Sequence, residues 1–126
     1  MPRYDLENRT AAFGIAVIRF VKTLPNNAVI KPIISQLIRS ATSIGANFCE
    51  ADDAESKRDL IHKLGICKKE ARETKHWLRM LVEVEPKVKE SARKLWQEAK
   101  ELNLIFNSII IKLKNKEALK IDKFGN

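Results

Sequence analysis

Apolar residues recur along this chain at alternating steps of three and four, which is the spacing of one face of an α-helix. Breaking or polar stretches interrupt the pattern at Pro25 to Asn27, at Ala51 to Glu55 and at Glu85-Pro86. The pattern between these breaks predicts helices at approximately 5–24, 29–50, 57–84 and 88–114, followed by a basic tail over 115–126.

Each predicted helix has one apolar row with the a and d spacing of helices that pack side by side in bundles. The rows of the first two helices are Leu6, Thr10, Phe13, Val17, Phe20 and Leu24, then Ile30, Ile34, Leu37, Ala41, Ile44 and Phe48. Those of the last two are Leu60, Leu64, Cys67, Ala71, Thr74, Leu78 and Leu81, then Val88, Ala92, Leu95, Ala99, Leu102, Phe106, Ile109 and Leu113. Because short connections make neighbouring helices antiparallel, we predict an all-α, up-down-up-down four-helix bundle. Residues 1–126 form its single domain.

The fourth helix carries more apolar residues than one core-facing row requires. Those off its row are Trp96, Leu104, Ile105, Ile110 and Ile111, and Trp77 lies off the row of the third helix. A helix that is apolar nearly all round is buried on more than one side. We therefore expect Trp77, Trp96, Ile105 and Ile110 to contribute to a subunit interface in a cyclic ring. A wider core-facing row is the alternative.

Composition adds a positive charge to this picture. The 126 residues include 24 basic and 16 acidic side chains, a net charge of +8, and residues 86–126 hold ten basic and five acidic groups. Such an excess is compatible with nucleic-acid binding, and equally with an ordinary solubilising surface. No apolar stretch approaches the length of a membrane span, and the first residues lack a signal peptide's apolar region. We expect a cytoplasmic protein with no membrane partner.

Basic residues form two rows that could neutralise phosphates. Lys68, Arg72, Lys75 and Arg79 share one flank of the third helix, and Arg93, Lys100 and Lys114 recur at sevens on the fourth, where Asn107 interrupts the row. We predict that these seven residues contact RNA or DNA phosphates. The alternative is an exposed flank paired with acidic neighbours one turn away. Aromatic residues are few, which disfavours a platform for stacking single-stranded bases.

Enzymatic chemistry has little support in the sequence. Glu73-Thr74-Lys75-His76 matches one Glu-x-x-His element of di-iron bundles, but a second is missing, and Glu73 and His76 fall on positions that face solvent. Glycine-rich phosphate loops and nucleophile elbows are absent. Cys49 and Cys67 lack a CxxC partner and are interpreted as small core residues. We predict no catalytic residue, metal or cofactor.

The second helix contains an unusual polar set. Ser43, Asn47 and Glu50 follow one another at i, i+4 and i+7, so they share a face. The small residues Gly45 and Ala46 permit close approach of another helix. This combination predicts a tightly packed, hydrogen-bonded helix interface.

The stretch from Arg39 to Glu50 resembles a hallmark of the four-helix-bundle proteins encoded in bacterial 23S rRNA intervening sequences, which typically reads R-x-A-x-S-I-P-A-N-I-A-E-G. The matching polar set is Arg39, Ser43, Asn47 and Glu50. The stretch from Ile61 to Thr74 resembles the family's third-helix pattern, with matches at Glu70, Ala71 and Glu73. Gly45 stands where the family usually has Pro, and Ala51 where it usually has Gly.

This resemblance implies a basic ring, usually a homopentamer, with an incompletely defined role that involves RNA or DNA. It also implies a relationship to the accessory proteins of diversity-generating retroelements, which are basic pentamers that bind a reverse transcriptase and its nucleic acid. The sequence therefore predicts a non-enzymatic, homo-oligomeric, nucleic-acid-binding bundle. The alternative is a protein-interaction scaffold or an accessory subunit of such a reverse transcriptase.

Overall fold

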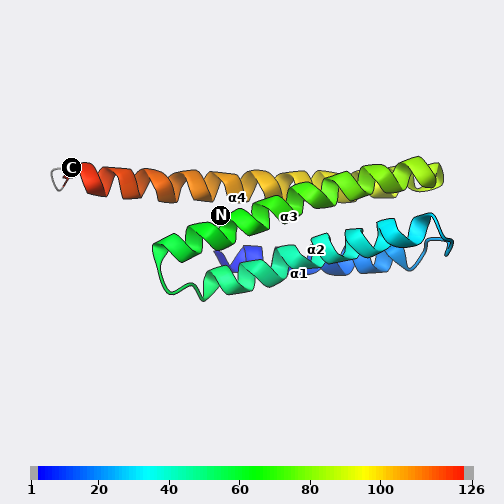
Figure 1. Ribbon diagram of the computed structural model, residues 1–126, viewed down its shortest axis with the longest axis horizontal. Coiled ribbons are helices and arrows are strands. Elements are labelled where there is room, and N and C mark those ends of the chain that lie inside the picture. The colour runs from blue at the N-terminus through cyan, green and yellow to red at the C-terminus, as the bar shows by residue number, and fades with distance from the viewer. Residues whose placement is uncertain (1–2, 124–126) are drawn as a thin grey trace.

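The computed structural model describes residues 3–123 of the chain and the side chains of residues 5–116. Its helices are α1 (Arg3–Val21), α2 (Ile30–Asp52), α3 (Lys57–Val84) and α4 (Lys89–Lys123), with a 3₁₀ turn, η1 (Pro86–Val88), before α4. Consecutive helices run in opposite directions (Figure 1), and the described residues form no strand. The predicted all-α architecture of four helices is confirmed. None of the described helices combines the length and the apolar character needed to cross a membrane.

Local capping explains where two of the helices begin. The Ser56 hydroxyl accepts a hydrogen bond of 3.0 Å from the Asp59 backbone N–H, which caps α3. At the start of α2, the Asn27 carboxamide oxygen accepts from the backbone N–H groups of Val29 and Ile30, each at 3.0 Å. These side chains satisfy N–H groups that have no partner inside the helix.

Helix α4 continues to Lys123, past its predicted end at residue 114. The stretch predicted as a basic tail is rich in Lys, Glu, Ala and Leu, which favour helix, and it has neither Pro nor Gly before Gly125. The last turns of α4 therefore project beyond the end of the bundle (Figure 1). Residues 124–126 lie outside the described part of the chain.

The predicted apolar rows form the core. Most members are buried, and Phe48 of α2 meets Phe106 of α4 with ring centroids 6.1 Å apart. Leu95, which the row places in the core, is only half-buried, as are members near the helix ends. The fully buried row members are Leu6, Val17, Leu37, Ala41, Ile44, Cys67, Ala71, Thr74, Leu81, Ala99, Leu102 and Phe106.

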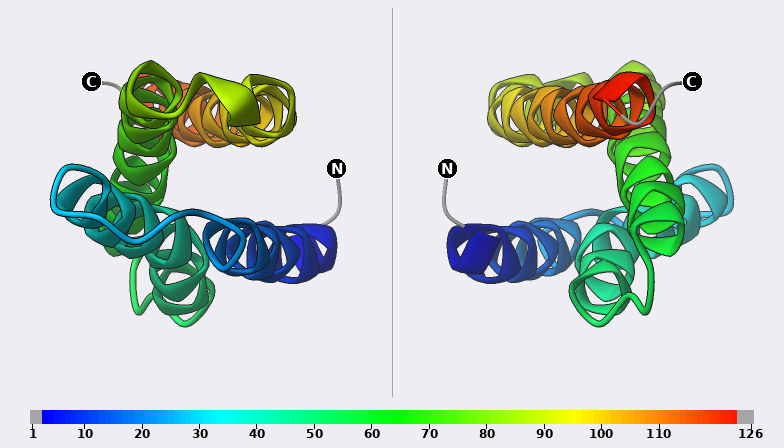
Figure 2. Two further views of the ribbon diagram at one scale, coloured as in Figure 1. Left: turned by 90° about the vertical axis from the view of Figure 1, so that its right-hand side faces the viewer. Right: turned by 90° about the vertical axis from the view of Figure 1, so that its left-hand side faces the viewer.

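The four helices lie around the bundle in chain order, with α2 and α3 between α1 and α4 (Figure 2). The pair α1 and α4 is joined at the Arg9 guanidinium, which donates to both carboxylate oxygens of Glu98 at 2.8 Å and to Glu101 at 3.2 Å. Helix α3 packs against both α2 and α4. The groove between α3 and α4 opens on the outside of the bundle, and the predicted basic rows lie along it.

Candidate nucleic-acid interface

The two predicted basic rows meet along the outer groove between α3 and α4. Three surface depressions follow this groove. Cations from both helices line the two outer depressions, and cations of α3 line the middle one, which Trp96 of α4 also borders. We call the surface the basic groove, and it comprises Lys68, Lys69, Arg72, Lys75 and Arg79 of α3 with Lys89, Arg93, Trp96, Lys100 and Lys114 of α4. All seven residues predicted to contact nucleic acid therefore belong to one surface. Sequence spacing could place each row on one flank, but only the packing of α3 on α4 brings the flanks together.

Trp96 lies at the centre of the basic groove. Its indole ring borders the middle depression and the depression next to it. The Lys75 ammonium lies 5.3 Å from the ring centroid and the Lys100 ammonium lies 5.6 Å from it. Both distances are within the range of cation–π attraction, so the ring holds one lysine from each row.

The cations of the basic groove differ in how they are engaged. The Lys68 ammonium donates to the Asn107 carboxamide oxygen at 2.9 Å. Asn107, which interrupts the basic row of α4, therefore contacts a lysine of the α3 row. Arg93 pairs with Glu90 at 2.7 Å, and this hydrogen bond raises the pKa of Arg93. Arg72, Arg79 and Lys114 are exposed and form no ion pair with any described side chain. These three offer charge that is free to meet an anion.

Acidic residues near the groove are mostly engaged elsewhere. The Glu73 carboxylate borders the middle depression, but it pairs with the Arg39 guanidinium and accepts a hydrogen bond of 3.0 Å from the Trp77 indole N–H. Glu83 lines the depression at the C-terminal end of α3. Glu70 and Glu73, the acidic neighbours one turn from the basic row of α3, pair with Arg39 of α2.

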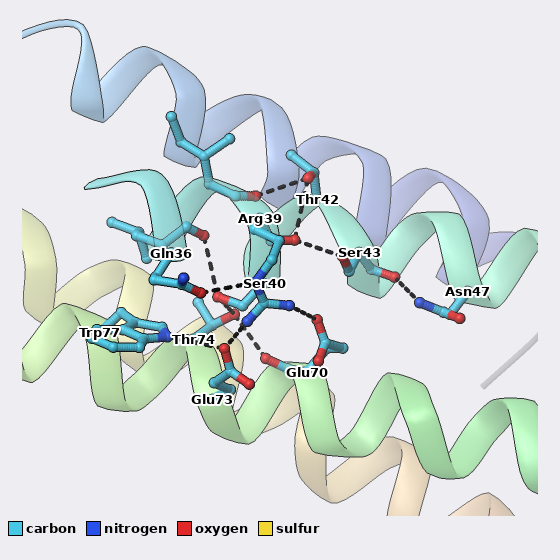
Figure 3. Close-up of polar contacts among 12 residues, drawn as sticks. Gln36, Arg39, Ser40, Thr42, Ser43, Asn47, Glu70, Glu73, Thr74 and Trp77 are labelled. Atoms are coloured by element: carbon cyan, nitrogen blue, oxygen red, sulfur yellow. Dashed lines mark hydrogen bonds and ion pairs between the residues drawn. The ribbon is translucent and has the colours of Figure 1, made fainter. Parts of the chain in front are cut away.

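Behind the groove, a polar cluster joins α2 to α3 (Figure 3). Arg39 donates to Glu70 at 2.9 Å, although the Glu70 residue is only 6% exposed. Beside this pair, the hydroxyl of Thr74 donates to that of Ser40 at 3.0 Å, and both residues are fully buried. Sequence reasoning missed the roles of Ser40 and of Glu70 in this cluster, although Glu70 stands in the row of residues that resembles the family pattern.

The family-motif polar set divides into two kinds of contact. Arg39 and Glu50 cross to α3, where the Glu50 carboxylate accepts from Lys63 at 2.9 Å. Ser43 and Asn47 stay within α2: Ser43 donates to the Arg39 carbonyl at 2.6 Å, and Asn47 donates to the Ser43 carbonyl at 2.8 Å. Of Ser43, Asn47 and Glu50, for which a hydrogen-bonded helix interface was predicted, only Glu50 bonds to another helix, and its side chain is 58% exposed.

The residues predicted to form a subunit interface occupy different environments. Trp77, Trp96 and Ile105 are partly buried against the core. Ile110 is only 8% exposed and packs inside the protomer, so it offers little surface to a second copy. Ile110 lies on the side of α4 that faces α3. The number of apolar positions on a helix does not show which side another helix covers. Among the described side chains of α4, the large apolar ones that are exposed are Leu104 at 56% and Ile111 at 49%.

The two cysteines also separate. Cys67 is buried, and burial raises the pKa of its thiol to about 12. Cys49 is exposed, so its interpretation as a core residue is wrong. Among the side chains of residues 5–116, no three His, Cys, Asp or Glu residues come together as a possible metal site.

Comparison with known proteins places this geometry in a family. The family model described as 23S rRNA-intervening sequence protein matches residues 4–108. The chain belongs to the 23S rRNA-intervening sequence protein family. The match spans α1 to α3, the first part of α4 and most of the basic groove, and it confirms the family resemblance of the stretches at Arg39 to Glu50 and Ile61 to Thr74.

A solved structure supports the same assignment to the 23S rRNA-intervening sequence proteins. The chain is similar to a protein of unknown function from the S23 ribosomal protein family of Bacteroides thetaiotaomicron VPI-5482, with 31% sequence identity and a TM-score of 0.76. The similarity covers 87% of this chain and 98% of that one. Among proteins with curated functions, none matches the chain.

Proposed function

We propose that this chain is a non-enzymatic, homo-oligomeric protein of the cytoplasm that binds RNA or DNA through the basic groove. The observation that carries the proposal is the meeting of two basic rows, from α3 and α4, along a single surface. A family description that refers to 23S rRNA supports a nucleic acid as the partner.

The arrangement of charge suits phosphates more than it suits base edges. Arg72, Arg79 and Lys114 are exposed and are spread along the groove, as contacts to a linear polyanion require. Contacts of this kind position a nucleic acid but carry little sequence information. We therefore propose binding with modest sequence preference and strong salt dependence.

Oligomerisation would strengthen such binding. We propose a cyclic homo-oligomer, with five subunits as the family resemblance implies. Exposed aliphatic side chains on α1 (Ile15 and Ile18) and on α4 (Leu104 and Ile111) are available for contacts between subunits. A ring repeats the basic groove around its axis, so that several weak contacts act together on one strand.

The proposal is tested by reversing the charge of two exposed groove residues, Arg72→Glu with Arg79→Glu. The control is Arg19→Glu with Lys31→Glu, which makes the same change of net charge at exposed positions on α1 and α2. Fluorescence anisotropy with labelled RNA and DNA is measured over a salt series. The groove variant should bind both weakly, with a log–log salt slope shallower by roughly 1 to 2, because about one counterion is released for each phosphate contact.

Two results would count against the proposal. If the control substitutions weaken nucleic-acid binding as much as the groove substitutions do, binding depends on net charge and not on the basic groove. If the wild-type protein binds neither RNA nor DNA at low salt, the basic surface serves a protein partner, and the role as an accessory subunit of a reverse transcriptase replaces the proposed one.

A further inference from the structure

We propose that the basic groove takes single-stranded nucleic acid and holds one of its bases against Trp96. This inference rests on the proposed function and specifies the class of ligand. It departs from the sequence-based expectation that few aromatic residues disfavour the stacking of single-stranded bases, because one well-placed ring suffices for one base. It follows from a feature that phosphate binding alone does not require, namely an apolar depression inside a cationic surface.

The depression lies where the C-terminal half of α3 faces the first turns of α4, and its volume is about 540 Å³. Its apolar wall includes Leu78, Val82, Ala92 and the Trp96 ring. This volume falls within the range of pockets that bind small organic ligands. A phosphate group gains nothing from such a wall, whereas a planar, largely apolar base does.

Cations surround the same depression. Arg79 of α3 and Lys89 and Arg93 of α4 line it, together with the Glu83 carboxylate. The ligand that matches an apolar pocket with a cationic rim carries a planar ring and anionic groups on one flexible chain. Single-stranded RNA or DNA has both, and Glu83 can accept a hydrogen bond from an exocyclic amino group of the base. In a duplex the bases are stacked and paired, so they cannot enter without being extruded.

Trp96 connects the pocket to the rest of the groove. Its ring also borders the middle depression, which Arg72, Lys75 and Arg79 line. Lys75 and Lys100 lie near the ring, and their long side chains can turn from it toward the phosphates that flank an inserted base. A base on the ring and phosphates on the lysines is the usual combination in proteins that bind single strands.

The test compares two single-stranded oligomers of equal length and equal charge, one a normal RNA and the other abasic. Wild-type protein should bind the RNA roughly 5- to 100-fold more tightly than the abasic oligomer, as expected for one stacked base. Trp96→Leu keeps the site apolar but removes the aromatic ring, and should abolish the preference for the RNA over the abasic oligomer. Trp96→Phe should restore most of the preference, and Trp77→Phe is the control outside the pocket.

The outcomes separate this inference from the proposed function. Wild-type protein that binds both oligomers equally well overturns base insertion and leaves the phosphate-binding groove intact. Failure to bind either oligomer at low salt overturns both. Sedimentation of Trp96→Leu and Trp96→Phe provides a second readout. If the wild-type protein is an oligomer and both variants are monomers, Trp96 is covered by another subunit, as its off-row position predicts. The inference is then wrong.

Discussion

At the scale of single residues, the buried polar cluster between α2 and α3 is the feature that needs the most explanation. A carboxylate as enclosed as that of Glu70 is costly unless a charged partner satisfies it. Arg39 provides that partner, and its guanidinium stays near the surface, where it also reaches Glu73. The Arg39–Glu70 pair fixes the axial register of α2 against α3, because sliding one helix by a turn would separate the two charges.

Core packing at the residue scale yields a stability prediction. Leu102 of α4 is fully buried, so Leu102→Ala should lower the free energy of unfolding by about 2–5 kcal/mol through lost burial and a residual cavity. Val29 is 64% exposed, and Val29→Ala should change the free energy of unfolding by less than about 0.5 kcal/mol. Urea denaturation of both variants makes the comparison. A loss below about 1 kcal/mol for Leu102→Ala would contradict the assignment of its row to the core.

At the scale of helices, small residues set how closely α1 and α2 approach. A Cβ atom added at Gly45 would lie 3.3 Å from the hydroxyl oxygen of Thr10, and one added at Gly14 would lie 3.7 Å from Thr42. Larger side chains at these positions would push the two helices apart. The predicted close approach through Gly45 is confirmed, and it involves α1.

Gly65 of α3 provides the contrasting case. An added Cβ there meets nothing within 4 Å, so Gly65→Ala should stabilise the protein by about 0.5–1 kcal/mol through lower backbone entropy of the unfolded chain. Gly45→Ala lowers the entropy of the unfolded chain in the same way, but its Cβ crowds Thr10. This variant should therefore gain less stability than Gly65→Ala, or lose stability. Thermal unfolding of the two variants side by side measures the difference. Equal gains would show that contact with α1 does not constrain position 45.

At the scale of the whole molecule, α4 exposes two large apolar side chains, Leu104 and Ile111. Leu104 and Ile111 are one heptad apart, so they share a face of α4 that no other helix of the protomer covers. A surface of this kind is typical of an interface with another protein. In the proposed assembly, a second copy of the chain covers it.

The proposed assembly predicts the effect of charging this face. Leu104→Glu with Ile111→Glu should convert an oligomer into a folded monomer, because burying the new carboxylates between subunits without partners would be costly. Sedimentation velocity measures the mass, and circular dichroism checks that helicity is retained. A wild-type protein that sediments as a monomer at micromolar concentration would contradict the assembly itself. An unchanged oligomer in the charged variant would place the interface on another face.

The pattern of apolar residues alone predicts the number of helices, most of their limits and most residues of the core. These properties follow from the short-range geometry of the helix, in which a repeat of 3.6 residues assigns each side chain to a face. The same geometry placed Lys68, Arg72 and Lys75 on one flank. Two helix ends differ most from the prediction. Helix α1 ends at Val21 and not at residue 24, and α4 continues past residue 114, because a lysine-rich stretch without breakers suits a solvated tail and an exposed helix equally well.

How these faces meet depends on the packing of the four helices. This packing joined the basic rows of α3 and α4 into one groove, turned Ile110 into the protomer core, left Leu104 exposed and set Trp96 between two lysines. Each of these outcomes depends on the rotation of one helix about its axis relative to its neighbours. That rotation is set by the packing of all the side chains at once, including the Arg39–Glu70 pair and the Gly45 contact, and no single row of residues contains it.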